Sequence, residues 1–261
     1  MASHDDFTDL ARFYDPIMRE VNYDRWLVVS TMVADLCAAE HPKHVDLACG
    51  TGTLLKRLIQ HGWDSVGIDI SPAMLREASK GPFRPPVAVA DLCRLPFGSR
   101  FDYATCVFDS LNFLLAPEQF DQAITAASDV LVDGGVFYFD VITERMVTHH
   151  FADMKWTEDN GKFSTTWEGS FDRETSIAEI EIRVNTGTPN LVRERVYSKR
   201  EIEAALKKAG FTLLIEVDAE NWTEPSFETT RVDRVAVKGA SKAIRVQAAK
   251  LQDRTRQLLR K

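Results

Sequence analysis

The stretch His44–Asp69, HVDLACGTGTLLKRLIQHGWDSVGID, decides the fold of this chain. It opens with an apolar, strand-like run at 44–48 and closes with a second one at 64–69, and a helical pattern lies between them. Gly50 and Gly52 follow the first run, where glycine allows a tight turn and a close approach of backbone to a ligand. The stretch therefore predicts a strand, a ligand-binding loop, a helix and a second strand.

The alternation of strands and helices continues on both sides of this unit. Expected helices cover about 5–18, 24–40, 117–131 and 199–209, and another is capped by Ser71 and started by Pro72. Further strand-like runs lie at 87–91, 101–108, 136–142, 211–220 and 231–239. This βαβ pattern predicts a parallel sheet with helices on both faces.

The pattern changes between residues 143 and 197. Polar and apolar residues alternate there, with turn signals at Asn160-Gly161, Asp172-Arg173 and Gly187-Thr188-Pro189-Asn190. We therefore expect an antiparallel β insert at 143–197 within a core made of 1–142 and 198–240. A basic helix at 241–261 ends the chain.

Composition and charge restrict the compartment and the partners. No apolar run reaches the roughly 20 residues that span a bilayer, and the N-terminus lacks a secretory pattern. The four cysteines form no CxxC pair and indicate buried thiols in a reducing, cytoplasmic environment without a membrane partner. The segment Lys238–Lys261 carries eight basic residues and one acid, so the rest of the chain has a net charge of −14. An acidic body argues against nucleic acid as a partner, although the tail could be either a packed or solvated helix or an RNA contact.

The loop predicts a nucleoside site without phosphates. Asp69 ends the second strand, the position from which an acid reaches ribose hydroxyls in doubly wound sheets. Leu54 or Leu55 replaces the third glycine of the dinucleotide fingerprint, and no P-loop lysine follows. Pyrophosphate binding, and with it a nicotinamide dehydrogenase, is disfavoured.

Four motifs in order resemble those of class I S-adenosylmethionine-dependent methyltransferases: VDLACGTGTLLKRL, GIDISPAML, ADLCRLPF and FDYATCVFDSLNFL. Ala48 stands where that family often has glycine. FYDPIM…YDRW, the insert and YSKREIEAALKKAGF resemble YqeM-type methyltransferases and, more loosely, sugar N,N-dimethyltransferases and glycine N-methyltransferases. The resemblance implies a Rossmann-like, seven-stranded, doubly wound α/β fold with N-terminal helices and the antiparallel insert.

The same resemblance implies a binding site for S-adenosyl-L-methionine and its product S-adenosyl-L-homocysteine. Asp69 would accept both ribose hydroxyls, Asp91 the adenine amino group, and Asp46 would hold the loop. The remaining residues implied to contact the donor are Tyr14, Trp26, Ala48, Gly50, Gly52, Ile70, Met74, Leu92 and Phe108, with Tyr23 as a further contributor.

The catalytic group is open at this level. Tyr14, Asp109 and His149 are the candidates: Asp109 could orient an amine or cap a short helix, and His149 with His150 could supply a base or simply occupy a loop. No metal site is expected, because no carboxylate or cysteine lies at ligand spacing from the histidine pair.

The insert and the acceptor leave alternatives. Aromatic and basic residues of the insert could form a roof over the acceptor pocket or a homodimer surface: Trp156, Phe163, Trp167, Phe171 and Arg195. The favoured function is in-line methyl transfer to a nitrogen or oxygen of a small molecule. The alternatives are a methyltransferase acting on RNA or protein, and a donor-binding module without turnover.

Overall fold

The structure, a computed structural model, describes residues 7–259. The first two residues of the helix predicted at 5–18, and Arg260 and Lys261 of the basic tail, lie outside the described residues.

A seven-stranded sheet forms the core, as predicted. Its strands run in the order β10-β11-β5-β4-β1-β2-β3; β1 to β5 are parallel, and β11 is antiparallel to both its neighbours. The strands are β1 (His44–Leu47), β2 (Ser65–Asp69), β3 (Val87–Val89), β4 (Phe101–Cys106), β5 (Leu131–Ile142), β10 (Phe211–Asp218) and β11 (Arg231–Lys238).

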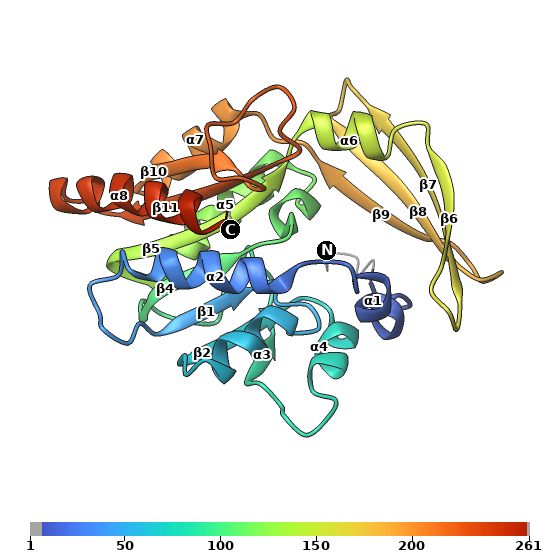
Figure 1. Cartoon of the computed structure of the whole chain (residues 1–261), viewed down its shortest axis with the longest axis horizontal. Helices are drawn as coiled ribbons and strands as arrows, with labels where there is room; N and C mark the ends of the chain where they lie inside the picture. Colours follow the sequence, from blue (N-terminus) through green and yellow to red (C-terminus); the bar gives the residue numbers. More distant parts are fainter. Residues whose placement is uncertain (1–6, 260–261) are drawn as a thin grey trace.

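Helices cover both faces of this sheet (Figure 1). They are α2 (Tyr23–Ala34), α3 (Thr53–Gln60), α4 (Pro72–Ala78), α5 (Pro117–Val130), α7 (Lys199–Lys208) and α8 (Lys242–Leu259). Two further helices, α1 (Ala11–Ile17) and α6 (Glu144–His150), lie beside the insert. Buried side chains of α5 and α7 form one apolar cluster with the sheet, and those of α2, α3 and α8 form a second. The core is therefore a three-layer, doubly wound arrangement.

The predicted helix ends are formed by the expected groups. Ser71 accepts a hydrogen bond from the Met74 amide at 3.2 Å, and Pro72 opens α4. Two helices are shorter than predicted because turns occupy the residues beside them. Helix α1 begins only at Ala11, and helix α2 ends already at Ala34.

The insert is a separate antiparallel sheet in the order β6-β7-β8-β9. Its strands are β6 (Lys155–Asp159), β7 (Ser164–Asp172), β8 (Ile177–Val184) and β9 (Asn190–Arg195). Strand β6 was not recognised as a strand in the sequence, because four of its five residues are exposed. The insert extends beyond the core sheet beside α1 (Figure 1), where Phe13 and Phe163 pack at 4.9 Å between ring centroids.

The basic tail packs against the core as helix α8. Ala248, Leu251 and Thr255 are buried, and Arg254 forms an ion pair with Asp35 at 3.3 Å. One face of the tail is thus packed against the core, and its basic side chains lie on the exposed face. Within residues 7–259, every helix is too short or too polar to cross a membrane.

Candidate functional site

A cavity of about 490 Å³ lies between the carboxyl ends of the core strands, α1 and the insert. Nine of the eleven residues predicted to contact the donor line it: Tyr14, Ala48, Gly50, Asp69, Ile70, Met74, Asp91, Leu92 and Phe108. Gly52 and Trp26 are not among the lining residues. One continuous space therefore joins the predicted donor site to the underside of the insert.

The loop after β1 adopts the backbone that its glycines suggest. The φ angles of Ala48, Gly50 and Gly52 are 58°, 55° and 72°. A Cβ at Gly50 would meet open space, whereas one at Gly52 would lie 3.4 Å from Ala78 Cβ. Ala48 adopts a left-handed conformation that costs an alanine roughly 1–2 kcal/mol. The strain and the open space above Gly50 both fit a loop shaped for a ligand.

Asp69 is held with its carboxylate at the cavity wall. Its side chain accepts hydrogen bonds from the Gly50 and Ser71 amides, both at 2.8 Å, and the residue is only 8% exposed. An ionised carboxylate has about four lone-pair sites and can accept hydrogen bonds from several donors at once. The geometry fits a ribose with two free hydroxyls.

Beneath the loop, a buried polar chain runs across three strands. Thr105 Oγ1 donates to Asp46 Oδ1 at 2.7 Å and lies 3.0 Å from His44 Nε2, and His44 Nδ1 lies 3.0 Å from Ser65 Oγ. Burial lowers the pKa of His44 to about 3, so its ring is neutral. Burial raises the pKa of Asp46 to about 7, with the Thr105 hydrogen bond opposing and the Asp69 carboxylate adding to the rise. Asp46 lines the cavity, and the hydrogen bond from Thr105 holds its carboxyl group on the side away from the cavity.

Tyr14, on α1, is one of the residues that line the cavity. Burial, with the nearby Tyr23, Asp109 and Asp69, raises its pKa well above the ordinary value. Its hydroxyl therefore stays neutral and can act as a hydrogen-bond donor rather than as a base.

Trp26 does not have the expected place. It is 9% exposed and packs behind Phe108, with ring centroids 5.4 Å apart, while its Nε1 donates to Asp140 Oδ2 at 3.3 Å. Tyr23 stacks on the same phenylalanine and does line the cavity. Trp26 therefore supports the wall that Phe108 and Tyr23 form, because its indole reaches inward to Asp140.

The chain after β4 has a strained conformation. Phe108 and Asp109 have φ angles of 65° and 55°, and such residues cost about 1–3 kcal/mol each. Asp140 holds both: its carboxylate accepts from the Phe108 amide at 2.7 Å and from the Asp109 amide at 2.6 Å. Strain of this kind concentrates at functional sites.

Arg231 completes this side of the cavity. Its Nη1 donates to Asp140 and its Nη2 to Asp109, each at 2.7 Å, and its guanidinium lies 5.2 Å from the Phe108 ring centroid. Asp109 is thus fixed by an ion pair. It does not cap the short 3-10 helix Ser110–Phe113, because no side-chain cap bond forms there.

The inner face of the insert covers the far end of the cavity. Its lining residues are Trp156, Glu158, Trp167, Ile180, Ile182, Val192 and Glu194. Phe163, Phe171 and Arg195 are not among them. Glu194 is only 7% exposed, and burial raises its pKa well above that of a free carboxyl group.

Three residues at the cavity wall or directly behind it, Asp140, Arg231 and Glu194, were not predicted from the sequence. Signals for two of them exist: Asp140 is an acid inside the apolar run FYFDVI, and Glu194 shares the inward phase of Val192. Arg231 has no comparable signal, because only the fold brings the start of β11 to the end of β4.

His149, a predicted candidate for the base, is away from the site. It lies with His150 on the exposed side of α6, and their rings contact each other at 5.1 Å between centroids. Met146, on another side of the same helix, lines the cavity instead. The two histidines therefore lie in a helix rather than in a loop, on the side of that helix that faces away from the cavity.

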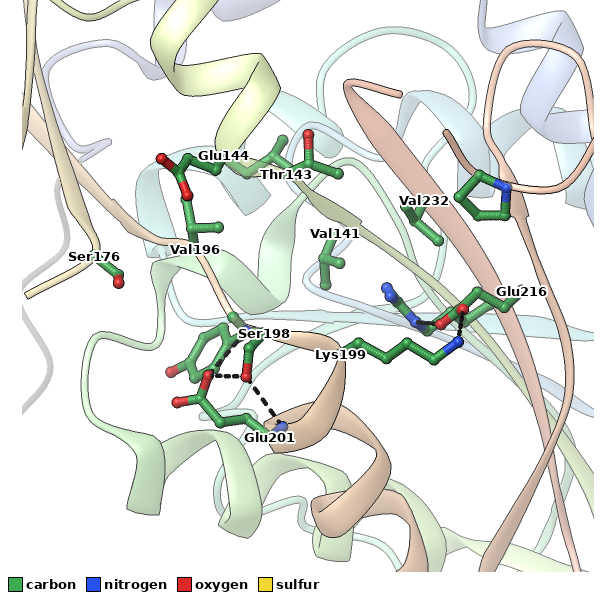
Figure 2. A pocket seen from close by; sticks show the side chains of 14 residues that line it. Val141, Thr143, Glu144, Ser176, Val196, Ser198, Lys199, Glu201, Glu216 and Val232 are labelled. Carbon is green, nitrogen blue, oxygen red and sulfur yellow. Dashed lines mark hydrogen bonds and ion pairs between the residues drawn. The ribbon is translucent and has the colours of Figure 1, made fainter. Parts of the chain in front are cut away.

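A second cavity, of about 380 Å³, lies where the insert joins the core (Figure 2). Lys199 and Arg234 both pair with Glu216, at 2.6 and 3.0 Å, and the Glu201 carboxylate accepts from Ser198. The other charged lining residue, Glu144, pairs with Arg173. Every charged side chain of this cavity therefore has a partner, because Glu201 also pairs with Arg195.

Comparisons with known proteins agree with this geometry. Residues 45–135 match a methyltransferase domain family. The protein YqeM of Bacillus subtilis is 27% identical over 87% of this chain and 94% of its own length. A dTDP-3-amino-3,6-dideoxy-alpha-D-glucopyranose N,N-dimethyltransferase of Streptomyces fradiae is 31% identical over 49% of this chain and 51% of its own. The crystal structure of an S-adenosylmethionine-dependent methyltransferase from Clostridium acetobutylicum superposes with a TM-score of 0.78, at 25% identity over 90% of this chain and 99% of that one.

Proposed function

The chain is an S-adenosylmethionine-dependent methyltransferase of the class I, Rossmann-like type, and we propose that it methylates a small molecule enclosed between the core sheet and the insert. Its four cysteines are free, which fits action in a reducing cytoplasm. The donor supplies an electrophilic methyl group when bound. The chain's own residues must bind both partners, align them and exclude water.

The observation that carries this proposal is the continuity of the cavity. One space extends from Gly50 and Asp69, past Tyr14, to the inner face of the insert. Asp69 and Asp91 would hold the nucleoside, and Tyr14 with Phe108 would border the transferred group. The insert covers the acceptor end, and a covered pocket favours a compact acceptor over a polymer.

Helix α8 packs on the core through Ala248 and Leu251, whereas its basic residues Lys242, Arg245 and Lys250 are exposed. Removing the tail would expose that apolar surface, so truncation is a poor test of RNA binding.

Labelled methyl donor tests the proposal directly. The protein is incubated with methyl-tritiated S-adenosylmethionine and, separately, with the low-molecular-mass, RNA and protein fractions of a bacterial extract. We expect label to enter the low-molecular-mass fraction and to be lost with Asp69→Ala. Label entering RNA or protein instead would contradict the proposal.

Calorimetry tests the nucleotide itself. Binding of S-adenosylmethionine and S-adenosylhomocysteine is expected, with NAD much weaker. Tighter binding of NAD than of either sulfur nucleoside would overturn the donor assignment.

A further inference from the structure

Glu194 is a buried carboxylate that faces the cavity. It lies on β9, at an inward position 7% exposed to solvent, and borders the cavity. Among residues 7–259, no side chain or backbone group forms a hydrogen bond or ion pair with this carboxylate. A buried charge without a partner is costly and marks a place where a ligand supplies the partner.

The neighbours of Glu194 cannot neutralise it. Ala178 lies opposite it on β8, and its inward neighbour along β9 is Val192. Arg231 is the cation whose charge acts on Glu194, but its guanidinium already donates to Asp109 and Asp140. Glu194 is therefore a third carboxyl group beside a guanidinium that is already paired with two, so carboxyl groups outnumber cations at this end of the cavity.

The electrostatics favour a carboxylate that takes up a proton. Burial and the Asp109 carboxylate raise the pKa of Glu194 well above its usual value, while Arg231 lowers it. A bound ammonium group would stabilise the ionised form, and a carboxylate with a raised pKa accepts a proton readily at neutral pH.

The other insert residues that line the acceptor end are apolar or aromatic, except Glu158, which accepts a hydrogen bond from Trp156 Nε1 at 2.9 Å. Trp156 and Trp167 stack with their rings parallel to within 1° and their centroids 5.5 Å apart, and both line the cavity beside Ile180 and Val192. Such a lining suits an apolar body, and tryptophan faces also favour a nearby cation.

We propose that the acceptor is an amine with an apolar body, and that Glu194 binds its ammonium group and then accepts a proton from it. This inference rests on the proposed function and specifies the acceptor of the same site. Glu194 is then a catalytic residue, supplied by the insert.

The proposed step balances. The ammonium nitrogen gives one proton to a Glu194 carboxylate oxygen and regains its lone pair. That lone pair forms the new nitrogen–carbon bond, and the electron pair of the broken carbon–sulfur bond remains on sulfur. The methylated amine leaves as a cation, and Glu194 returns its proton to solvent.

The test uses the full chain saturated with S-adenosylhomocysteine and three probes of one shape: 2-phenylethylamine, 2-phenylethanol and phenylacetate. Calorimetry gives the affinity of each for the wild type, for Glu194→Gln and for Glu181→Gln. Glu181 lies on the exposed face of neighbouring β8, so its substitution is the matched control.

We expect the wild type and Glu181→Gln to bind the amine about 10- to 100-fold more tightly than the alcohol, and phenylacetate most weakly. Glu194→Gln should lose this preference. Equal affinities in the wild type, a preference for the alcohol, or no detectable binding of the amine would each overturn the proposal. A preference that survives Glu194→Gln would overturn the role of Glu194.

Donor affinity separates two uses of the same carboxylate. If Glu194 serves the acceptor, Glu194→Gln leaves the ratio of S-adenosylmethionine to S-adenosylhomocysteine affinities unchanged, which also reports that the variant is folded. A loss confined to the cationic donor would place Glu194 at the sulfonium and overturn the proposal. Failure of the wild type to bind either nucleoside would instead refute the proposed function, whatever the probes do.

Competition with dTDP tests the apolar body. The Streptomyces fradiae relative is named for a dTDP-sugar substrate, but Arg231 is the one cation among the described lining residues and is already paired. We expect dTDP not to displace 2-phenylethylamine. Displacement would overturn the apolar-body half of the proposal.

Discussion

Two cavities border the insert, and they differ in how their charges are satisfied. In the smaller one, Lys199 and Arg234 share Glu216 (Figure 2), and the remaining carboxylates pair with arginines that lie outside the cavity lining. In the larger one, Glu194 has no partner among the described residues, and Phe108 and Asp109 are strained. The smaller cavity lies where the insert joins the core, and its charges are satisfied within the protein. The larger cavity has an unpaired carboxyl group and strained backbone at its wall, which are features typical of ligand-binding sites.

Asp140→Asn should have the largest effect on stability, because Asp140 supports one wall of the larger cavity. The substitution removes the charge that holds Arg231 and weakens the bonds that hold the strained amides of Phe108 and Asp109. We expect the free energy of unfolding to fall by about 3–5 kcal/mol, as when one partner of a buried ion pair is lost. Urea denaturation measures it.

Asp133→Asn is the matched control, because Asp133 is an exposed residue of the same strand. It should leave stability within about 0.5 kcal/mol of the wild type. Similar losses for the two variants would contradict the role given to Asp140.

Asp69→Ala tests nucleoside binding at the donor end of the larger cavity. Losing the acceptor of the ribose hydroxyls should weaken S-adenosylhomocysteine binding by roughly 1–3 kcal/mol, or about 5- to 150-fold, by calorimetry. Asp64→Ala, an exposed acid just before the same strand, should bind normally. An unchanged affinity for Asp69→Ala would remove this residue from the site.

His44 gives the donor end of the molecule a pH dependence of its own. Folding lowers the pKa of His44 from 6.5 to about 3, so its stabilisation is complete above pH 6.5 and is lost as the pH falls toward 3. Between these limits the wild type should lose about 1.4 kcal/mol per pH unit relative to His44→Gln. Urea denaturation at pH 7 and pH 5 measures the difference, with exposed His150→Gln as the control; parallel profiles for wild type and His44→Gln would refute it.

Lys199→Ala should have the smallest effect. Its side chain is 63% exposed, and exposed ion pairs contribute less than about 1 kcal/mol. Donor and amine affinities should not change. A large loss of either affinity would show that the smaller cavity is coupled to the site after all.

The donor end of the site was predictable because it is local in sequence. Gly50 and Asp69 lie 19 residues apart on one strand–helix–strand unit, so their types and spacing fix their geometry. The antiparallel insert was predictable for a similar reason, since its alternation and turn signals are local.

The acceptor end was not predictable because it forms only in the folded chain. Asp109 meets Arg231 across 122 positions, and the Asp140 contact to Trp26 spans 114. The errors at Trp26 and His149 have one cause. A helical residue can be assigned to its helix from sequence, but which side of the helix faces the cavity depends on how the helix packs.

The alternation of the insert has a consequence for divergence within such enzymes. On each of β7, β8 and β9, only every second residue faces the cavity. These inward residues include Trp167 on β7, Ile180 and Ile182 on β8, and Val192 and Glu194 on β9. The intervening residues face solvent and form cross-strand ion pairs such as Arg193 with Glu179. A few substitutions at these inward positions, by natural divergence or by design, can therefore change the acceptor preference. The machinery that recognises the methyl donor lies on other strands and is left intact.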